Sequence, residues 1–210
     1  MQTILSAVFC AHLSSLFNFN TEPAHAGYIG EGMLAGAVLG GIFASPSVHQ
    51  ILAAIRAVTI PDSPENKGCL LIVKNYTGDR LNFGMACELA LAEKRKCQMI
   101  VVSDDCAVPR NKGITGSRGV AGTVFVHKVA GAASQRGMSL EEVAELGAYT
   151  AGRIGSLGVA LNAVTLPGAT EINDRLTNGK MEIGLGIHGE AGIRQCDLMC
   201  ADDIAKVNLS

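Results

Sequence analysis

The sequence predicts an α/β fold in which a mostly parallel sheet is flanked by helices. Two short apolar runs, residues 70–74 and 98–103, are rich in β-branched and long aliphatic side chains, which is typical of buried strands. Longer segments with helical spacing of their apolar residues lie between and after these runs. Strands that alternate with helices pair in parallel through right-handed crossovers. With 210 residues, of which 48% are apolar, the chain can bury a sizeable core.

Two helices are expected beside these strands in the first half of the chain. One covers residues 47–59, because Pro46 stands near its start and its apolar residues, Ile51, Leu52, Ile55 and Val58, share one face. The other covers residues 80–96 and follows the first strand directly. We interpret its basic triplet, residues 94–96, as the solvated end of the helix.

The second half begins with a polar loop and continues with helices and strands. Residues 104–118 contain proline and glycines that are typical of loops, and helical spacing resumes over 120–135. Ser139 and Glu142 form a predicted capping box that opens a helix running to about residue 154. The remaining elements are two strands and a final short helix, expected at residues 157–166, 181–187 and 201–209.

A histidine, His188, lies in a stretch with almost no side-chain bulk. Glycines occupy positions 184, 186, 189 and 192 around it, and glycine lets backbone and ligand approach closely. Imidazole is suited to nucleophilic or proton-transfer chemistry near neutral pH. The pattern alone also fits a buried or solvated histidine in a glycine-rich turn.

A second candidate site follows the strand over residues 70–74. The apolar run ends in Lys74-Asn75-Tyr76-Thr77-Gly78-Asp79 and then enters a helical pattern. In open α/β sheets, ligands bind at the carboxyl ends of the strands. Lysine can hold a phosphate or an oxyanion, and aspartate can accept a hydroxyl proton.

Four blocks of the chain, residues 22–33, 70–84, 119–128 and 181–192, together resemble the substrate-binding (K) unit of dihydroxyacetone kinases. The resemblance implies that His188 attacks the ketone carbon of dihydroxyacetone and holds the substrate as a hemiaminal. It also implies that Lys74 and Asp79 contact the substrate hydroxyl or the product phosphate. Asp79 would accept the proton of the hydroxyl that attacks phosphorus. The attacking imidazole must be neutral, so substrate binding is expected to weaken as the pH falls.

One segment departs from the pattern of this family. The family carries Gly-Gly-Gly-Ser-Gly-His directly before the block that begins at Glu22, whereas this chain reads Leu-Phe-Asn-Phe-Asn-Thr over residues 16–21. Thr21 therefore stands at the position of a family histidine, and threonine is no general base at neutral pH. The alternative to a kinase part is consequently an inactive truncated isoform or a dihydroxyacetone-binding sensor.

The expected cofactors and partners follow from the same resemblance. The glycine clusters lack the Gly-Lys-Ser/Thr ending of a phosphate loop, so no cofactor is expected in this chain. ATP and Mg²⁺ would be supplied by an all-helical L domain or by a separate subunit. The resemblance also implies a homodimer and a role in glycerol metabolism.

Composition narrows the class of partner and the compartment. A formal net charge of −2 argues against nucleic acid, and no run is long and apolar enough for a membrane span. The seven cysteines form no CxxC pair, which favours reduced thiols in the cytoplasm and no structural metal.

The resemblance begins at Glu22, and this divides the predicted domain from what precedes it. We expect an atypical N-terminal segment over residues 1–21 and a partial, incomplete K domain over 22–210. The first segment is apolar and has neither lysine nor arginine. It fits an N-terminal helix, a targeting segment or an alternative start of a shortened gene model, and we favour the last.

Overall fold

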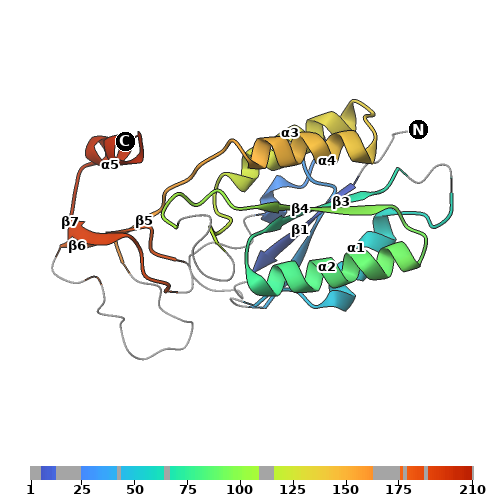
Figure 1. The fold of residues 1–210 in the computed structure, drawn as a ribbon, viewed down its shortest axis with the longest axis horizontal. Helices are drawn as coiled ribbons and strands as arrows, with labels where there is room; N and C mark the ends of the chain where they lie inside the picture. Colours follow the sequence, from blue (N-terminus) through green and yellow to red (C-terminus); the bar gives the residue numbers. More distant parts are fainter. Residues whose placement is uncertain are drawn as a thin grey trace. The chain divides into compact units, whose positions relative to one another are not determined.

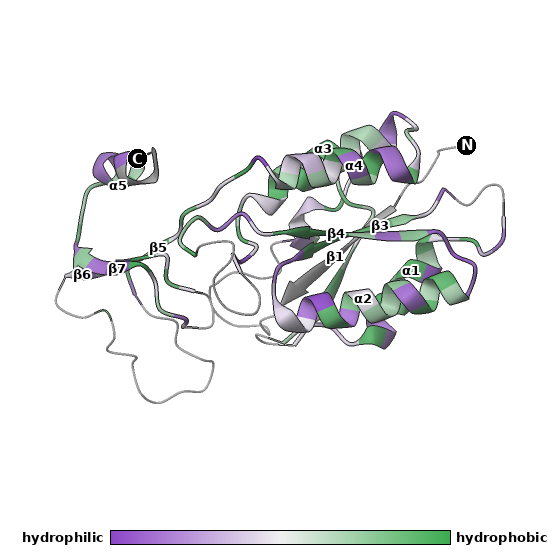
Figure 2. Ribbon diagram, viewed as in Figure 1, coloured by the Kyte–Doolittle hydropathy of each residue, from purple (hydrophilic) through white to green (hydrophobic). Residues whose placement is uncertain are grey.

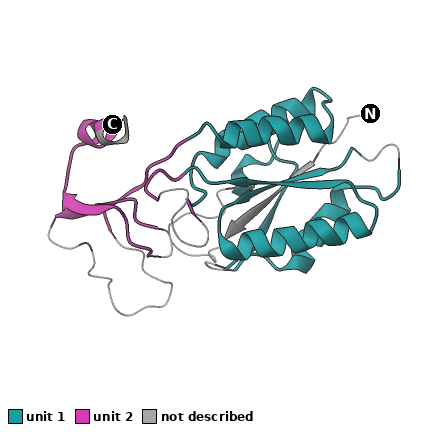
Figure 3. Cartoon of the chain, in the orientation of Figure 1, with its two compact units in different colours: residues 1–104, 118–154 teal, residues 105–117, 155–210 magenta. Residues whose placement is uncertain are grey.

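The computed structural model describes the main chain of residues 6–12, 25–41, 44–63, 67–108, 116–162, 176, 179–186 and 189–209, and the side chains of these residues other than 6–12 and 207–209. The chain divides into two compact units (Figure 3). Unit 1 comprises residues 1–104 and 118–154, and unit 2 comprises residues 105–117 and 155–210.

Unit 1 is a parallel sheet with a pair of helices on each face, which confirms the predicted α/β class (Figure 1). The strand order is β2-β1-β3-β4, and every neighbouring pair is parallel. The strands are β1 (Ser6–His12), β2 (Gly36–Gly40), β3 (Cys69–Lys74) and β4 (Cys97–Val102). The helices are α1 (Val48–Val58) and α2 (Thr77–Ala92) on one face, and α3 (Thr123–Gln135) and α4 (Leu140–Ala151) on the other.

Strand β3 supplies side chains to both layers of the core. Leu70 and Ile72 pack with α3 and α4, whereas Leu71 and Val73 pack with α1 and α2. This alternation follows from the two-residue period of a strand, and it explains why β3 reads as an unbroken apolar run. Strands β3 and β4 are accordingly mostly hydrophobic in Figure 2, and hydrophilic segments lie on the helices and loops around them.

Two helices begin at residues other than those the sequence predicts. Helix α2 begins at Thr77 instead of residue 80. The residue before it, Tyr76, has an extended backbone conformation and is the N-cap. Helix α3 begins at Thr123 instead of residue 120. The carboxylate of Asp104 accepts the N–H groups of Val120 and Gly122 at 2.8 and 2.7 Å, and this holds the chain before α3 in a turn.

The predicted capping box of α4 is confirmed. The Ser139 hydroxyl accepts the N–H of Glu142, and the Glu142 carboxylate accepts the N–H of Ser139 at 2.8 Å. The helix ends at Ala151, a turn earlier than residue 154. Helix α1 has the same device, in which Ser47 is the N-cap and pairs with Gln50. Both helices therefore begin where their sequences satisfy the first N–H groups.

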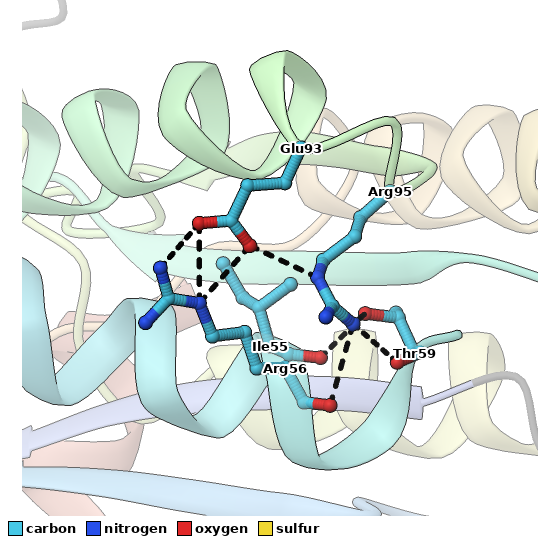
Figure 4. Close-up of polar contacts among 5 residues, drawn as sticks. All are labelled: Ile55, Arg56, Thr59, Glu93 and Arg95. Atoms are coloured by element: carbon cyan, nitrogen blue, oxygen red, sulfur yellow. Dashed lines mark hydrogen bonds and ion pairs between the residues drawn. The ribbon is translucent and has the colours of Figure 1, made fainter. Parts of the chain in front are cut away.

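Polar contacts join the C-terminal ends of α1 and α2 (Figure 4). Arg56 pairs with Glu93, and Arg95 donates both to Glu93 and to the carbonyl oxygen of Thr59. The hydrogen bond from Arg56 is the main cause that lowers the pKa of Glu93 to about 2. The side chain of Arg95 is only 13% exposed. The prediction that residues 94–96 form a solvated helix end is therefore wrong for Arg95. Helix α2 stops at Ala92, and the chain reverses at Lys94, whose φ is +58°.

Residues 6–12 at the N-terminal end form β1, which lies between β2 and β3 in the sheet. The helix that we considered for the first 21 residues is therefore not formed over these seven positions. In the described part of the chain, no helix is both long and apolar enough to cross a bilayer.

Unit 2 contains a small antiparallel sheet, so the expectation of parallel pairing is wrong for its strands. Strand β6 (Lys180–Ile183) lies between β5 (Val159–Ala160) and β7 (Arg194–Asp197). Within the described residues, the strand expected at 157–166 covers only Val159–Ala160, the strand expected at 181–187 covers Lys180–Ile183, and β7 was not predicted. Helix α5 (Ala201–Leu209) follows, as expected.

The antiparallel pairing of β6 and β7 has a local cause. Strand β6 ends at Ile183, the next residue, Gly184, has a φ of +76° in the left-handed region, and only ten residues separate β6 from β7. A connection this short is typical of antiparallel neighbours, because a parallel crossover needs a dozen or more residues. The buried Glu182 fixes the return of the chain by accepting the N–H of Gly192 at 2.6 Å.

Candidate functional site

The candidate site lies at the carboxyl end of β3, where two of the predicted residues are found. Lys74 is the last residue of the strand and is half-buried. The next residue, Asn75, donates its N–H to the carbonyl oxygen of Val102 at 2.9 Å, and this ties the end of β3 to the end of β4. Asp79 follows in the first turn of α2 and is only 1% exposed. The strand and the helix therefore present both residues at the same edge of the sheet.

Asp79 is held by a serine that the sequence analysis did not select. Ser45, which lies between β2 and α1, donates its hydroxyl to Oδ1 of Asp79. Its segment is docked on α2 by a second contact, in which Asn82 donates to the carbonyl oxygen of Pro46 at 2.8 Å. A carboxylate in the first turn of a helix is also stabilised by the helix dipole. Ser45 follows a strand at its carboxyl end, and this signal could have identified it.

Glycine is required at two positions that enclose these side chains. A Cβ atom on Gly78 would lie 2.6 Å from Oγ of Ser45. A Cβ atom on Gly119 would lie 2.5 Å from the carbonyl oxygen of Val102 and 2.8 Å from Cα of Lys74. These distances are all shorter than an ordinary carbon contact, so Gly78 leaves room for the Ser45 side chain and Gly119 lets the backbone of Val102 and Lys74 approach closely.

A buried histidine pair lies near Lys74 and was also missed. Nδ1 of His25 and Nε2 of His127 are 3.0 Å apart, and the rings of Tyr28 and His127 meet edge to face with centroids 6.0 Å apart. Burial, and then the positive charge of Lys74, lower the pKa of His127 to about 3. His127 is therefore neutral at physiological pH. With His25 2% and His127 0% exposed, the pair is a structural contact between residues 25–28 and α3.

The remaining predicted residues lie outside the part of the chain that the structure describes. They are His188 and Thr21. Lys74 and Asp79 belong to unit 1, whereas position 188 belongs to unit 2, so the pairing of His188 with Asp79 stays a prediction. Among the described residues, no three His, Cys, Asp or Glu side chains are grouped in a way that could hold a metal ion.

The comparison with protein families gives a direct assignment. Residues 21–210 match the Dak1 domain. The chain belongs to the Dak1 domain family. This confirms the resemblance that was based on four sequence blocks.

Relatives of this Dak1 chain carry kinase names. It is 51% identical over 188 residues to the triokinase/FMN cyclase of Rattus norvegicus, covering 90% of this chain and 32% of that protein. It is 48% identical over 185 residues to the dihydroxyacetone-binding subunit of a PTS-dependent dihydroxyacetone kinase of Listeria innocua, covering 88% of this chain and 55% of that subunit.

Two solved structures share the fold. The dihydroxyacetone kinase of C. freundii superimposes with a TM-score of 0.86 and 42% identity, covering 100% of this chain and 36% of that one. A dihydroxyacetone kinase operon co-activator superimposes with a TM-score of 0.83 and 34% identity, covering 97% of this chain and 60% of that one. The Dak1 chain thus spans about a third of the length of the kinase relatives that consist of a single long chain.

Proposed function

We propose that this chain is the substrate-binding part of a dihydroxyacetone kinase. The observation that carries the proposal is the buried Asp79 carboxylate, held by Ser45 at the same carboxyl edge of the Dak1 sheet at which β3 ends in Lys74. The names of the related kinases and of the dihydroxyacetone-binding subunit support the choice of substrate. A carboxylate, a hydroxyl and an ammonium group together match the two hydroxyl groups of dihydroxyacetone and the phosphate of its product.

The proposed chemistry begins with a covalent bond to His188. A neutral imidazole nitrogen adds to the carbonyl carbon, the carbonyl oxygen takes up a proton, and the imidazole gives up its N–H proton, so a neutral hemiaminal forms. Glycerol has no carbonyl carbon and is rejected, although hydrogen bonds alone would discriminate poorly between two such small molecules. The bond also fixes the substrate for phosphoryl transfer, where positioning supplies much of the rate.

Asp79 acts in the second step. It accepts the proton of the substrate hydroxyl while the hydroxyl oxygen forms a bond to the terminal phosphorus of ATP and the bond from that phosphorus to the departing ADP oxygen breaks. The hydroxyl of Ser45 donates to the same carboxylate and keeps it oriented. Lys74 then stabilises the negative charge of the transferred phosphate.

Partners are needed to complete the reaction. We propose that ATP and Mg²⁺ are bound by an L domain or a separate subunit, that the chain forms a homodimer and that it acts in the cytoplasm in glycerol metabolism. The name of the Listeria protein, a binding subunit of a kinase, supports a division of substrate and donor between parts.

NMR with dihydroxyacetone labelled with ¹³C at the carbonyl carbon tests the first step. The carbonyl signal should be replaced by that of a tetrahedral carbon on the protein, and His188→Ala should abolish the new signal while Asp79→Asn retains it. Absence of a tetrahedral carbon in the folded wild-type chain at saturating substrate would contradict the hemiaminal.

A second candidate function is a dihydroxyacetone-responsive sensor without phosphoryl transfer. The structural similarity to an operon co-activator and the threonine at position 21 favour it. The two functions are separated by adding ATP, Mg²⁺ and the L domain of a related kinase and measuring triose phosphate. Product formation identifies the kinase part, and an adduct without product identifies the sensor.

A further inference from the structure

Helix α2 contacts the segment before α1 at two successive residues. The hydroxyl of Ser45 donates to Oδ1 of Asp79, and the side-chain amide of Asn82 donates to the carbonyl oxygen of Pro46 at 2.8 Å. Asp79 and Asn82 are three residues apart in the helix and therefore lie on the same side of it. A single hydrogen bond lets a hydroxyl shift about its acceptor, whereas two contacts from one helix fix the segment against that helix.

The segment is also held on either side of these two residues. Before them, the N–H of Ala44 donates to the carbonyl oxygen of Gly41 at 3.1 Å, and a Cβ atom on Gly40 would collide with the carbonyl oxygen of Ala44. After them, Ser47 begins α1 as its N-cap. The contact from Asn82 therefore docks on α2 a segment whose two ends are already held.

Asn82 is not required to hold α1 and α2 together. The two helices share one buried apolar cluster, and their C-terminal ends are joined by Arg56 and Glu93 (Figure 4). Asparagine is also a weaker helix former than alanine, so it costs helix stability at this interior position. A residue that costs helix stability, and whose contact the helices do not need, fits a role at the carboxylate of Asp79.

We propose that Asn82 is a positioning residue for phosphoryl transfer: it holds the carbonyl group of Pro46 and so keeps the Ser45 hydroxyl on Asp79. The inference rests on the proposed function of Asp79 as the proton acceptor. The hydrogen bond from Ser45 fixes the direction of the carboxylate, and a carboxylate that turns away loses its alignment with the substrate hydroxyl. Asn82 acts through the two residues of the segment and takes no proton itself.

Two substitutions test this role in the full chain supplied with ATP, Mg²⁺ and the L domain of a related kinase. Asn82→Ala removes the donor, and Asn82→Asp keeps the shape but sets a carboxylate against a carbonyl oxygen. Each should lower kcat for triose phosphate about 10- to 100-fold, the range expected for a misplaced reacting group. The ¹³C signal of the dihydroxyacetone adduct should stay within about twofold of the wild-type signal, because the bond to His188 does not involve Asp79.

The split between transfer and adduct separates positioning from a loss of folded protein. Circular dichroism and melting temperature identify a variant that fails to fold. Asn82→Ala keeps the test valid if Asn82→Asp fails, because alanine favours the helix. An adduct lost in proportion to kcat would overturn the positioning role.

A double variant tests whether Asn82 acts through Ser45. Ser45→Ala removes the hydroxyl that orients the carboxylate, and it should lower kcat by itself. In that background Asn82→Ala should cause no further loss, since the group that it positions is already absent. If the losses of the two single variants multiply in the double variant, the route through Ser45 is wrong.

Gln135→Ala is the matched control. Its amide, at the end of α3 on the other face of the sheet, donates to Glu31 at 2.7 Å, so the change removes the same kind of contact elsewhere (Figure 1). It should leave kcat unchanged, and a loss equal to that of Asn82→Ala would overturn the inference. A wild-type chain that forms no triose phosphate would overturn the proposed function and this inference with it. An active wild-type chain and an equally active Asn82→Ala chain would overturn the positioning role alone.

Discussion

The two edges of the parallel sheet in unit 1 use polar side chains in opposite ways. At the amino edge, Arg56, Glu93 and Arg95 satisfy one another and the carbonyl oxygen of Thr59 (Figure 4). At the carboxyl edge, Ser45 orients the Asp79 carboxylate, Gly78 leaves room for the Ser45 side chain, and Gly119 packs closely on Val102 and Lys74. The amino edge holds two helices together, whereas the carboxyl edge arranges groups that can serve a ligand. Polar contacts therefore indicate function only together with their place in the fold.

The largest effect is expected from Asp79→Asn. The amide has nearly the shape of the carboxylate and can still accept from Ser45, but it cannot accept a proton from the substrate hydroxyl. Phosphoryl transfer, measured as triose phosphate formed with ATP and the L domain of a related kinase, should fall ~10²–10⁴-fold. The adduct with dihydroxyacetone should persist.

Asp104→Asn is the control for this prediction. Asp104 is a buried carboxylate at the same edge, but it accepts two backbone N–H groups before α3. Its replacement should lower the free energy of unfolding and leave the substrate affinity of the folded molecules unchanged. If phosphoryl transfer falls equally in Asp79→Asn and Asp104→Asn, the assignment of Asp79 as the proton acceptor is contradicted.

Gly119→Ala should be the most destabilising single methyl addition among the changes considered. The new Cβ would press on Val102 and Lys74, and overpacking of this kind costs about 2–3 kcal/mol of unfolding free energy. Gly30→Ala is the control, because nothing lies within 4 Å of its Cβ position. Urea unfolding of both variants measures the difference, and equal midpoints would contradict the close packing around Lys74.

The buried His127 should make the unfolding free energy of unit 1 depend on pH. Its pKa is about 3 in the folded chain and about 6.5 in an unfolded one, so between these values the unfolded state binds a proton that the folded state excludes. Stability should therefore fall as the pH decreases from 6.5, by up to about 1.4 kcal/mol per pH unit. His127→Gln should reduce this slope in urea titrations at pH 6.5, 5.5 and 4.5. An unchanged slope would show that His127 is not buried as a neutral group.

Substitutions at the amino edge of the sheet should have the smallest effects. Arg95→Met should lower the free energy of unfolding by about 1–2 kcal/mol, because it removes a charged donor from the last carbonyl groups of α1. Arg56→Met should cost less, since its side chain is 51% exposed and water screens the pair with Glu93. Neither change should alter substrate binding. An Arg56 effect larger than that of Arg95 would contradict this ranking.

The sequence was most informative where local chemistry decides the structure. The β3 run predicted a buried strand, Ser139 and Glu142 predicted a helix start, and Lys74 and Asp79 were placed correctly at a carboxyl edge. Each of these rests on neighbouring residues alone.

Contacts between residues far apart in the chain could not be predicted from the sequence. Ser45 and Asp79 are 34 positions apart, and His25 and His127 are 102 positions apart. No local spacing in the sequence therefore indicates either pair. The antiparallel sheet of unit 2 was missed for a different reason. Its strands are two to four residues long, which is too short for a periodic pattern, and the turn glycines that set their direction resembled a ligand loop.

Amide chemical shifts of the ¹⁵N-labelled chain, recorded while dihydroxyacetone is added, compare the two edges in one experiment. Our account predicts saturable shifts at residues 76–80, near Asp79, and none at residues 59–62 or 93–96. Shifts confined to the amino edge, or a spectrum of the folded chain that does not change at any substrate concentration, would contradict the assignment of the carboxyl edge as a substrate site.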